Sequence, residues 1–416
     1  MGAPHREIPA RLVQEHMEEL HRLTDTAGGK VVGTMIQRID SPTPQTYIGS
    51  GKVEELRRFV AEREADLVIF DEELKPDQAK NLEDALDTRI MDRSELILDI
   101  FASRARTREA KLQVELAQLQ YLLPRLARMW THLSRIRGGI GLRGPGETQI
   151  ETDRRLINRR IAELRRKLKS VAEARATQRK RREGEFRVAL MGYTNAGKSS
   201  ILRALSGSEV FVEDRLFATL DSATRQVDLG SGYECLVTDT VGFIRKLPHH
   251  LVASFRSTLE EAREADLLLH VIDASHPDRD EQVEVVDEVL ADLELDKRPQ
   301  ILVFNKVDRL THGEEEALRD RVRAFTETAA VFVSAVEEGG LEPLVEAIRA
   351  RVRHRYPRVE VDLPAADGEL LASLHREGEV LDQKGNGARI RITARIPEAL
   401  LGRLRQEPGV EVTEGT

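Results

Sequence analysis

The spacing of apolar residues over the first hundred positions predicts alternating strands and helices. Residues 30–39 and 66–70 form strand-like apolar runs, whereas residues 52–64 and 76–86 have the spacing of amphipathic helices. Strands that alternate with helices are typical of a parallel sheet covered by helices. We therefore predict a small α/β domain over residues 1–106.

Residues 107–184 have a different period, in which apolar residues are separated alternately by four and three positions. The first series comprises Leu112, Leu116, Leu119, Leu123, Leu126 and Trp130, and the second comprises Ile157, Ile161, Leu164, Leu168 and Val171. This spacing is that of the apolar stripe of a coiled coil, and two such helices joined by a loop fold back as an antiparallel hairpin. Pro124 lacks a backbone N–H, so we expect it to kink the first helix.

The segment that joins the two predicted helices, residues 135–146, is rich in glycine and arginine. It contains five glycines together with Arg135, Arg137 and Arg143. Because glycine leaves the backbone mobile and arginine is rarely buried without a partner, this segment does not suit a core. We expect it to lie exposed at the tip of a helical arm, where the three arginines are candidates for contacts with RNA phosphates.

Five apolar runs between residues 185 and 356 alternate with helical stretches. The runs cover residues 187–191, 235–238, 267–272, 300–304 and 330–333. This order predicts an open, doubly wound α/β sheet. Residues 357–416 contain further short strand-like and helix-like pieces, which predict a small α/β appendage.

Composition places the chain among globular proteins. Its 416 residues are enough for about three domains. Apolar residues make up 40% and charged residues 33%, a balance that argues against a disordered or a membrane protein. No apolar stretch approaches the ~20 residues that span a bilayer, and the N-terminus lacks the apolar core of a secretory signal. We expect a cytoplasmic protein without a membrane span, in which the single cysteine, Cys235, is a small buried side chain.

Charge is distributed unevenly along the chain. The net charge is −8, but residues 101–187 contain 23 Lys and Arg against 9 Asp and Glu. A basic segment inside an acidic protein indicates a polyanionic partner, whose binding weakens as salt rises. A solvated basic face without a partner explains the charge equally well.

A phosphate-binding loop follows the predicted strand at residues 187–191. Its residues are Gly192, Tyr193, Thr194, Asn195, Ala196, Gly197, Lys198 and Ser199, and Ser200 opens a helix-like run. The glycines let backbone N–H groups converge on phosphate oxygens at a helix N-terminus. Lys198 is placed to reach the β- and γ-phosphates, and Ser199 is placed to bind Mg²⁺. Gly49-Ser-Gly-Lys52 lacks this spacing, and we interpret it as a turn that opens a helix.

Two further segments supply candidates for the magnesium site. Asp239, Thr240, Val241 and Gly242 follow the predicted strand at residues 235–238, which places the Asp239 carboxylate near the metal and the Gly242 N–H near the γ-phosphate. Thr219 is the candidate switch threonine for Mg²⁺, and Thr224 is the second choice. Lys198, Thr219 and Gly242 are therefore the candidate catalytic residues.

An Asn-Lys-x-Asp motif, formed by Asn305, Lys306 and Asp308, follows the predicted strand at residues 300–304. An Asp carboxylate accepts hydrogen bonds from the guanine N1–H and exocyclic amine, a pair that adenine does not offer. Lys306 can lie along the base, and Ser334 and Ala335 can donate backbone N–H groups to the guanine oxygen. The motif favours GTP and GDP over adenine nucleotides.

Four sets of segments are specific enough to indicate a family. They are residues 98–102 with 111–118, residues 141–149 with 151–155, residues 216–221, and residues 239–244 with 247–249. With them the chain resembles, along nearly its whole length, the HflX-type ribosome-associated GTPases. The resemblance implies a GTPase that binds the large ribosomal subunit, reaches its RNA through the helical arm, and splits or rescues stalled ribosomes under stress. We also expect a monomer away from the ribosome.

Several positions differ from the expected pattern. Ser200 and the segment Asp221-Ser-Ala-Thr224 replace an expected Thr and an expected Asp-Pro-Thr-Thr. Phe243 follows Gly242 where many small GTPases have a glutamine that orients water, so we expect a low intrinsic rate. Phe243 is either a core anchor of the switch or a gating residue. Asn195 is similar to the asparagine of potassium-stimulated RNA-modification GTPases, which makes K⁺ a candidate second cofactor.

Two other functions stay open at this point. One is a GTPase that modifies or matures RNA, although the added domains show no modification chemistry. The other is a nucleotide-gated scaffold whose hairpin dimerises through its apolar stripe.

Overall fold

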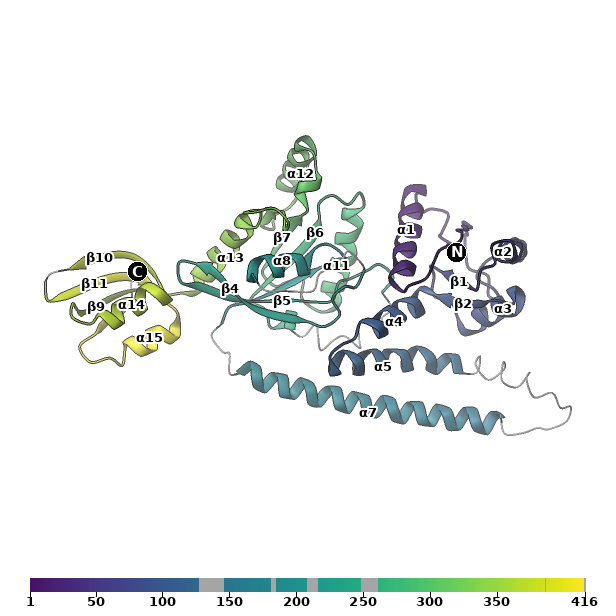
Figure 1. Cartoon of the computed structure of the whole chain (residues 1–416), viewed down its shortest axis with the longest axis horizontal. Coiled ribbons are helices and arrows are strands. Elements are labelled where there is room, and N and C mark those ends of the chain that lie inside the picture. The colour runs from purple at the N-terminus through teal and green to yellow at the C-terminus, as the bar shows by residue number, and fades with distance from the viewer. Residues whose placement is uncertain (127–145, 181–184, 208–215, 248–260, 386, 415–416) are drawn as a thin grey trace. The chain divides into compact units, whose positions relative to one another are not determined.

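The computed structural model describes residues 1–126, 146–180, 185–207, 216–247, 261–385 and 387–414. By their contacts these residues divide into two compact units. Within the described ranges, the first unit comprises residues 1–174, 216–221 and 246–247, and the second comprises residues 175–245 without 216–221, followed by residues 261–414. Figure 1 labels their elements.

The N-terminal part of the first unit is built around two parallel strands. Its elements are α1 (Ala10–Thr26), α2 (Ser50–Arg63), β1 (Leu67–Phe70), α3 (Pro76–Leu86), β2 (Arg89–Asp92) and α4 (Arg93–Arg104). β1 and β2 pair in parallel, and the buried Phe70, Leu82 and Ile90 belong to the core between strands and helices. Gly49 is the N-cap of α2, which confirms the prediction of a turn that opens a helix.

The strand predicted at residues 30–39 is wrong. This stretch forms only two isolated bridges, which join Gly2 with Ile36 and His5 with Ile39. Val32 and Ile36 stay 44% and 39% exposed. Strand formation depends on packing against neighbours, and this apolar run has neither a continuous ladder nor a buried face.

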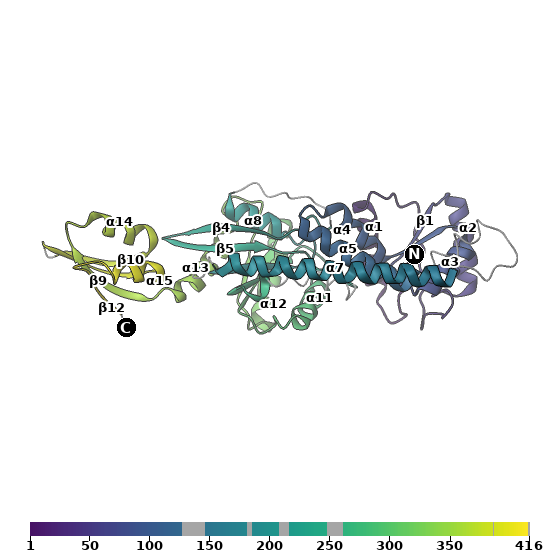
Figure 2. The same ribbon diagram turned by 90° about the horizontal axis from the view of Figure 1, so that it is seen from below.

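Two antiparallel helices, α5 (Arg108–Leu122) and α7 (Gly146–Lys180), form the arm. They lie side by side in both views of the chain (Figures 1 and 2). Leu116, Ile161 and Leu164 are buried between them, which confirms the predicted hairpin.

Pro124 was expected to kink the first helix of the arm, and in the structure this helix ends before it. α5 ends at Leu122, and Pro124 lies in the 3₁₀ turn η1 (Leu123–Arg125) that follows. Trp130 and the predicted tip with Arg135, Arg137 and Arg143 lie outside the described residues.

A six-stranded sheet forms the centre of the second unit. Its elements are β3 (Arg187–Gly192), α8 (Lys198–Ser206), β4 (Ala223–Gly230), β5 (Tyr233–Asp239), β6 (Leu267–Asp273), α11 (Arg279–Asp292), β7 (Gln300–Asn305), η2 (Val307–Arg309), α12 (His312–Phe325), β8 (Ala330–Phe332) and α13 (Glu342–Arg355). The strand order is β4-β5-β3-β6-β7-β8. All neighbours are parallel except β4 and β5, and all five predicted runs are strands.

Sequence analysis missed β4, the antiparallel edge strand. Only Val227 and Leu229 of β4 are buried, while Arg225 and Gln226 are exposed. An edge strand with one solvated face has too few apolar positions to form a continuous run. Its partner β5 includes Cys235, which is buried as expected.

The C-terminal part of the second unit is a four-stranded antiparallel sheet with two helices. Its elements are β9 (Arg358–Pro364), α14 (Gly368–Glu377), β10 (Glu379–Gly385), β11 (Arg389–Arg395), α15 (Glu398–Leu404) and β12 (Glu411–Glu414), in the strand order β10-β11-β9-β12. Val361, Ile392 and Leu404 belong to its core. It joins the central sheet through Glu379, which accepts a 2.6 Å hydrogen bond from the Tyr233 hydroxyl and pairs with Arg353 at 2.9 Å.

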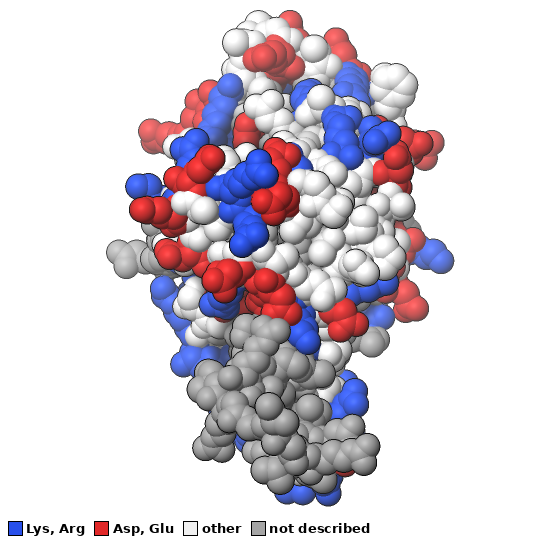
Figure 3. Space-filling model, turned by 90° about the vertical axis from the view of Figure 1, so that its right-hand side faces the viewer, with Lys and Arg blue, Asp and Glu red and all other residues white. Residues whose placement is uncertain are grey.

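No helix in the described part of the chain is long and apolar enough to cross a bilayer. On the face drawn in Figure 3, acidic and basic side chains are interspersed, and neither sign forms a continuous patch among the described residues.

Candidate nucleotide-binding site

The phosphate loop connects the end of β3 to the start of α8 in the second unit. Gly192 has φ 146°, and a Cβ there would lie 2.2 Å from the Val271 carbonyl oxygen. Gly197 has φ 98°, and a Cβ there would lie 2.2 Å from Asn305 Nδ2. Both positions therefore require glycine for conformation and for space. They allow the loop to turn tightly and to present backbone N–H groups at the N-terminus of α8.

Lys198 lies inside the loop rather than in solvent. Its side chain is 6% exposed, and its Nζ donates to the carbonyl oxygens of Gly192 at 3.0 Å and Tyr193 at 2.8 Å. Burial lowers the pKa of Lys198 to about 8, and the nearby Asp239 carboxylate opposes that shift. A phosphate group beside Nζ would further favour the charged form, because opposite charges raise the pKa of an amine.

Two of the three oxygen donors predicted for Mg²⁺, Ser199 and Asp239, are adjacent in the second unit. The Ser199 hydroxyl donates to Asp239 Oδ2 at 2.6 Å, and Asp239 is fully buried at the end of β5. The Thr240 hydroxyl donates to the Leu190 carbonyl oxygen at 2.6 Å, which fixes the chain after Asp239. Hydroxyl and carboxylate oxygens are the donors that Mg²⁺ prefers, so these residues fit the ion.

The chain after Asp239 returns along the phosphate loop. Phe243 N–H donates to the Gly192 carbonyl oxygen at 3.1 Å, and Thr194 N–H donates to the Phe243 carbonyl oxygen at 2.7 Å. A Cβ at Gly242 would lie 2.7 Å from Thr194 Cα and 3.0 Å from Lys198 Nζ, so only glycine fits there. The Phe243 side chain is 2% exposed, which favours its interpretation as a core anchor.

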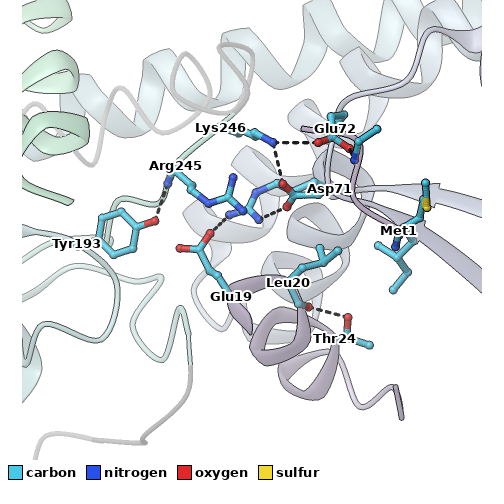
Figure 4. Close-up of polar contacts among 12 residues, drawn as sticks. Met1, Glu19, Leu20, Thr24, Asp71, Glu72, Tyr193, Arg245 and Lys246 are labelled. Carbon is cyan, nitrogen blue, oxygen red and sulfur yellow. Dashed lines mark hydrogen bonds and ion pairs between the residues drawn. The ribbon is translucent and has the colours of Figure 1, made fainter. Parts of the chain in front are cut away.

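Tyr193 also contacts this returning segment. Its hydroxyl accepts a hydrogen bond from Arg245 N–H at 2.9 Å (Figure 4). The phosphate loop thus holds the segment at Phe243 through its backbone and at Arg245 through the Tyr193 side chain.

The predicted guanine-binding residues surround the end of β7. Asn305 Nδ2 donates to the Ala196 carbonyl oxygen at 3.0 Å, which ties this strand end to the phosphate loop. The Ser334 hydroxyl donates to Asp308 Oδ1 at 2.6 Å and orients that carboxylate. Ala335 N–H donates to Asn305 Oδ1 at 3.2 Å in this structure, so the N–H offered to the guanine oxygen already has a partner.

Asp273, a binding partner of Lys306, is a residue of the site that sequence analysis missed. The Lys306 Nζ donates to the Asn195 carbonyl oxygen at 2.8 Å and to Asp273 Oδ2 at 2.7 Å. Asp273 is the last residue of β6, beside Asn305 of β7 in the parallel ladder. Its position as a carboxylate at the end of a strand was a usable signal, since ligands bind at the carboxyl ends of parallel strands.

The two threonine candidates have different surroundings. Thr219 belongs by its contacts to the first unit, whereas Ser199 and Asp239 belong to the second. Thr224 lies in β4, and its hydroxyl is 2.9 Å from the Thr238 hydroxyl of β5. Thr224 is therefore engaged within the sheet in this structure.

Lys246 is a second residue that sequence analysis missed. Its Nζ lies 2.7 Å from Asp71 Oδ2 and 3.5 Å from Glu72 Oε1, within the first unit (Figure 4). Asp71 also pairs with Arg93 at 2.9 Å, and the same arginine pairs with Glu19. No motif predicts these contacts, because the partners are far apart in the sequence.

Comparison with known proteins gives three matching family models. They are GTP-binding GTPase N-terminal over residues 14–102, GTP-binding GTPase Middle Region over residues 104–182, and 50S ribosome-binding GTPase over residues 187–306.

Curated relatives match over most of both chains. The GTPase HflX of Magnetococcus marinus is 47% identical over 96% of this chain and 93% of the relative. The GTPase HflX of Flavobacterium psychrophilum is 53% identical over 83% of this chain and 88% of the relative. The GTPase HflX of Escherichia coli is 41% identical over 95% of this chain and 93% of the relative. The chain belongs to the GTPase HflX family.

This membership confirms the resemblance seen in the sequence. The HflX-family chain is a GTPase, and it hydrolyses GTP. As in P-loop GTPases generally, Mg²⁺ accompanies the nucleotide.

Proposed function

We propose that this HflX-family GTPase binds the large ribosomal subunit, contacts its RNA through the basic arm, and splits or rescues stalled ribosomes under stress. The observation that supports this most directly is the joining of a basic hairpin to a GTPase. Residues 101–187 hold 23 Lys and Arg against 9 Asp and Glu, and they connect directly to the phosphate loop. The match of residues 187–306 to a 50S ribosome-binding GTPase model agrees with it.

The roles proposed for the site residues follow from their chemistry. Lys198 neutralises phosphate charge, and Ser199, Asp239 and Thr219 hold Mg²⁺, which when bound shields the charge on the phosphates. Gly242 N–H contacts the γ-phosphate. The phosphate loop from Gly192 to Ser200 and the segment from Asp239 to Gly242 surround the phosphates. Asn305, Lys306, Asp308, Ser334 and Ala335 bind the guanine base.

K⁺ is proposed as a second cation through Asn195. This residue has φ 63°, an unusual backbone conformation for a residue other than glycine, and its carbonyl oxygen accepts from Lys306. Hydrolysis measured in KCl and in NaCl at equal ionic strength tests the proposal. Equal rates in the two salts would remove K⁺ from the mechanism.

A cytoplasmic monomer away from the ribosome is the proposed resting form. Leu116, Ile161 and Leu164, which a dimerising hairpin would need at its surface, are buried within the hairpin of one chain. This burial weighs against the scaffold that dimerises through its apolar stripe. Light scattering of the free protein tests the monomer.

Co-sedimentation with ribosomal subunits tests the central proposal. The protein is mixed with large subunits in the presence of a non-hydrolysable GTP analogue, GDP or no nucleotide. We expect the largest bound fraction with the GTP analogue, because a switch that senses the γ-phosphate distinguishes the two nucleotides. Equal, salt-insensitive binding in all three conditions, or no binding at all, would contradict the proposal.

A further inference from the structure

The segment that contains Thr219 is anchored on both sides within the first unit. Phe217 lies two residues before Thr219, and Asp221 lies two residues after it. Leu216, Phe217 and Leu220 are buried. The flanks of Thr219 are therefore held by the N-terminal part of the chain.

Asp221 binds the N-terminus of α5, the first helix of the arm. Its Oδ2 accepts from Arg106 N–H at 3.1 Å and from Thr107 N–H at 3.2 Å, and its Oδ1 accepts from the Thr107 hydroxyl. Thr107 is itself the N-cap of α5, since its hydroxyl oxygen accepts from Ala110 N–H at 3.1 Å. A carboxylate at this end of a helix is favoured by the helix dipole and by unsatisfied backbone N–H groups.

Phe217 provides the anchor on the other side of Thr219. Its ring packs edge-on against Phe101 of α4, with 4.7 Å between ring centroids and 86° between planes. Its φ is 55°, which is unfavourable for a bulky residue. A conformation of this kind persists where surrounding contacts determine it, and here the ring is 1% exposed.

We propose that Asp221 is a positioning residue for Thr219 and that the base of the arm, through Thr107, thereby controls the response of the site to GTP. The proposal rests on the magnesium role proposed above for Thr219. Only three residues separate the two anchors, Phe217 and Asp221, which leaves Thr219 few positions. Movement of the first turn of α5 would carry Asp221 with it and change the access of Thr219 to the metal.

The proposal predicts different effects on the binding of GTP and on the binding of GDP. A switch threonine contacts Mg²⁺ when the γ-phosphate is present and releases it when the γ-phosphate is gone. Anchoring the threonine therefore favours GTP more than GDP. A residue that merely supports the fold would affect both nucleotides alike.

The first experiment measures nucleotide affinity in the full-length chain. Asp221→Ala should weaken binding of a fluorescent non-hydrolysable GTP analogue in Mg²⁺ by roughly tenfold and change GDP binding by less than about twofold. Asp228→Ala is the matched control, because Asp228 is exposed on β4 and accepts a hydrogen bond from Gly230 N–H at 2.8 Å. Equal effects of the two substitutions, or equal losses for GTP analogue and GDP, would overturn the proposal.

Substitutions of Thr107 separate positioning from folding. Thr107→Ser keeps the cap and the bond to Asp221, so it should leave nucleotide binding unchanged. Thr107→Asp keeps an acceptor for Ala110 N–H but places a second carboxylate against Asp221, and should reproduce the loss of GTP preference. The double variant Thr107→Asp with Asp221→Asn provides a donor to the new carboxylate and should restore most of that preference. If the double variant prefers the GTP analogue no more strongly than Thr107→Asp does, the contact between residues 107 and 221 does not control this preference.

Thr219→Ala distinguishes this inference from the function on which it rests. If Thr219→Ala leaves the preference for the GTP analogue intact, the magnesium role of Thr219 is wrong and the inference falls with it. If Thr219→Ala abolishes the preference while Asp221→Ala does not, only the positioning role is wrong. Loss of preference in both variants is the result we expect.

Discussion

The Lys198 side chain and the segment at residues 216–221 are held by contacts of very different range. Lys198 donates to carbonyl oxygens five and six positions before it. Asp221, by contrast, is bound by residues 114 and 115 positions away, at the start of α5. A side chain held by its own neighbours keeps its position when distant parts of the chain move. A segment held by a distant helix follows that helix, which suits a switch better than a binding site.

The largest effect is expected from substitution of Arg93, which lies at the centre of the long-range ion pairs of the first unit. Arg93 is 1% exposed and pairs with Asp71 and Glu19. Arg93→Met should lower the free energy of unfolding by about 3–5 kcal/mol, because buried carboxylates then lose their charged partner. Thermal or urea unfolding measures the loss.

Arg89→Met is the control for this prediction. Arg89 is exposed and pairs with Glu95 at 3.1 Å, so its loss should cost less than about 1 kcal/mol. Similar losses for the two variants would mean that the buried ion pairs do not hold the first unit together.

The next effect concerns the locally held Lys198 side chain. Lys198→Ala should lower the rate of GTP hydrolysis by about 100- to 1000-fold, because one preorganised charge facing the phosphates is removed. The fold should persist, since the neighbouring strand and helix do not depend on this side chain. Phosphate release at saturating GTP measures the rate, and Lys297→Ala, on the exposed surface of the same unit, serves as control. Retention of the parental rate would place the active site elsewhere.

A smaller effect is expected at Asp308, where one substitution tests the preference for guanine. Asp308→Asn should weaken GTP binding by about 1–3 kcal/mol and favour xanthosine triphosphate, because an amide donor then faces the guanine N–H groups. The Ser334 hydroxyl can still donate to the remaining oxygen, so the loop should keep its shape. Competition binding with both nucleotides measures the preference. Asp320→Asn on α12 should leave it unchanged, and unaltered GTP affinity in Asp308→Asn would remove the guanine assignment.

The smallest effect is expected at the arm, where many charges share the binding. Replacing Arg135, Arg137 and Arg143 by Gln removes three potential phosphate contacts, so the slope of log affinity against log salt for ribosomes should fall by roughly 2–3. Intrinsic hydrolysis should not change. Replacing Arg57, Arg58 and Arg63 of α2 by Gln removes the same charge elsewhere and should leave the slope as it is. An unchanged slope in the arm variant would contradict the RNA binding that we propose for the tip.

Local chemistry explains which parts of the site could be predicted from the sequence. Gly192, Lys198 and Ser199 act within one strand, one turn and one helix, so their spacing determines their arrangement. Asn305 and Asp308 were found for the same reason. Asp273 and Lys246 were missed because their partners, Lys306 and Asp71, are brought to them by the fold and not by a motif.

The fold, too, could be predicted where a regular apolar pattern specifies an element and was missed where that pattern is lacking. The central parallel strands are buried on both faces and read as apolar runs, whereas β4, with one solvated face, does not. The hairpin was predictable because Leu116 and Ile161 follow a regular period. The C-terminal appendage was predicted as a small α/β part, but β10 was not, because this strand is largely exposed and forms no apolar run.

The length of α7 has a mechanical consequence. Its 35 residues extend for roughly 50 Å at the usual rise of 1.5 Å per residue. A rigid rod of that length converts a rotation of about 6° at one end into a displacement of about 5 Å at the other, close to one helical turn. Small rearrangements where the arm begins are thereby amplified to the scale of a nucleotide step at its far end.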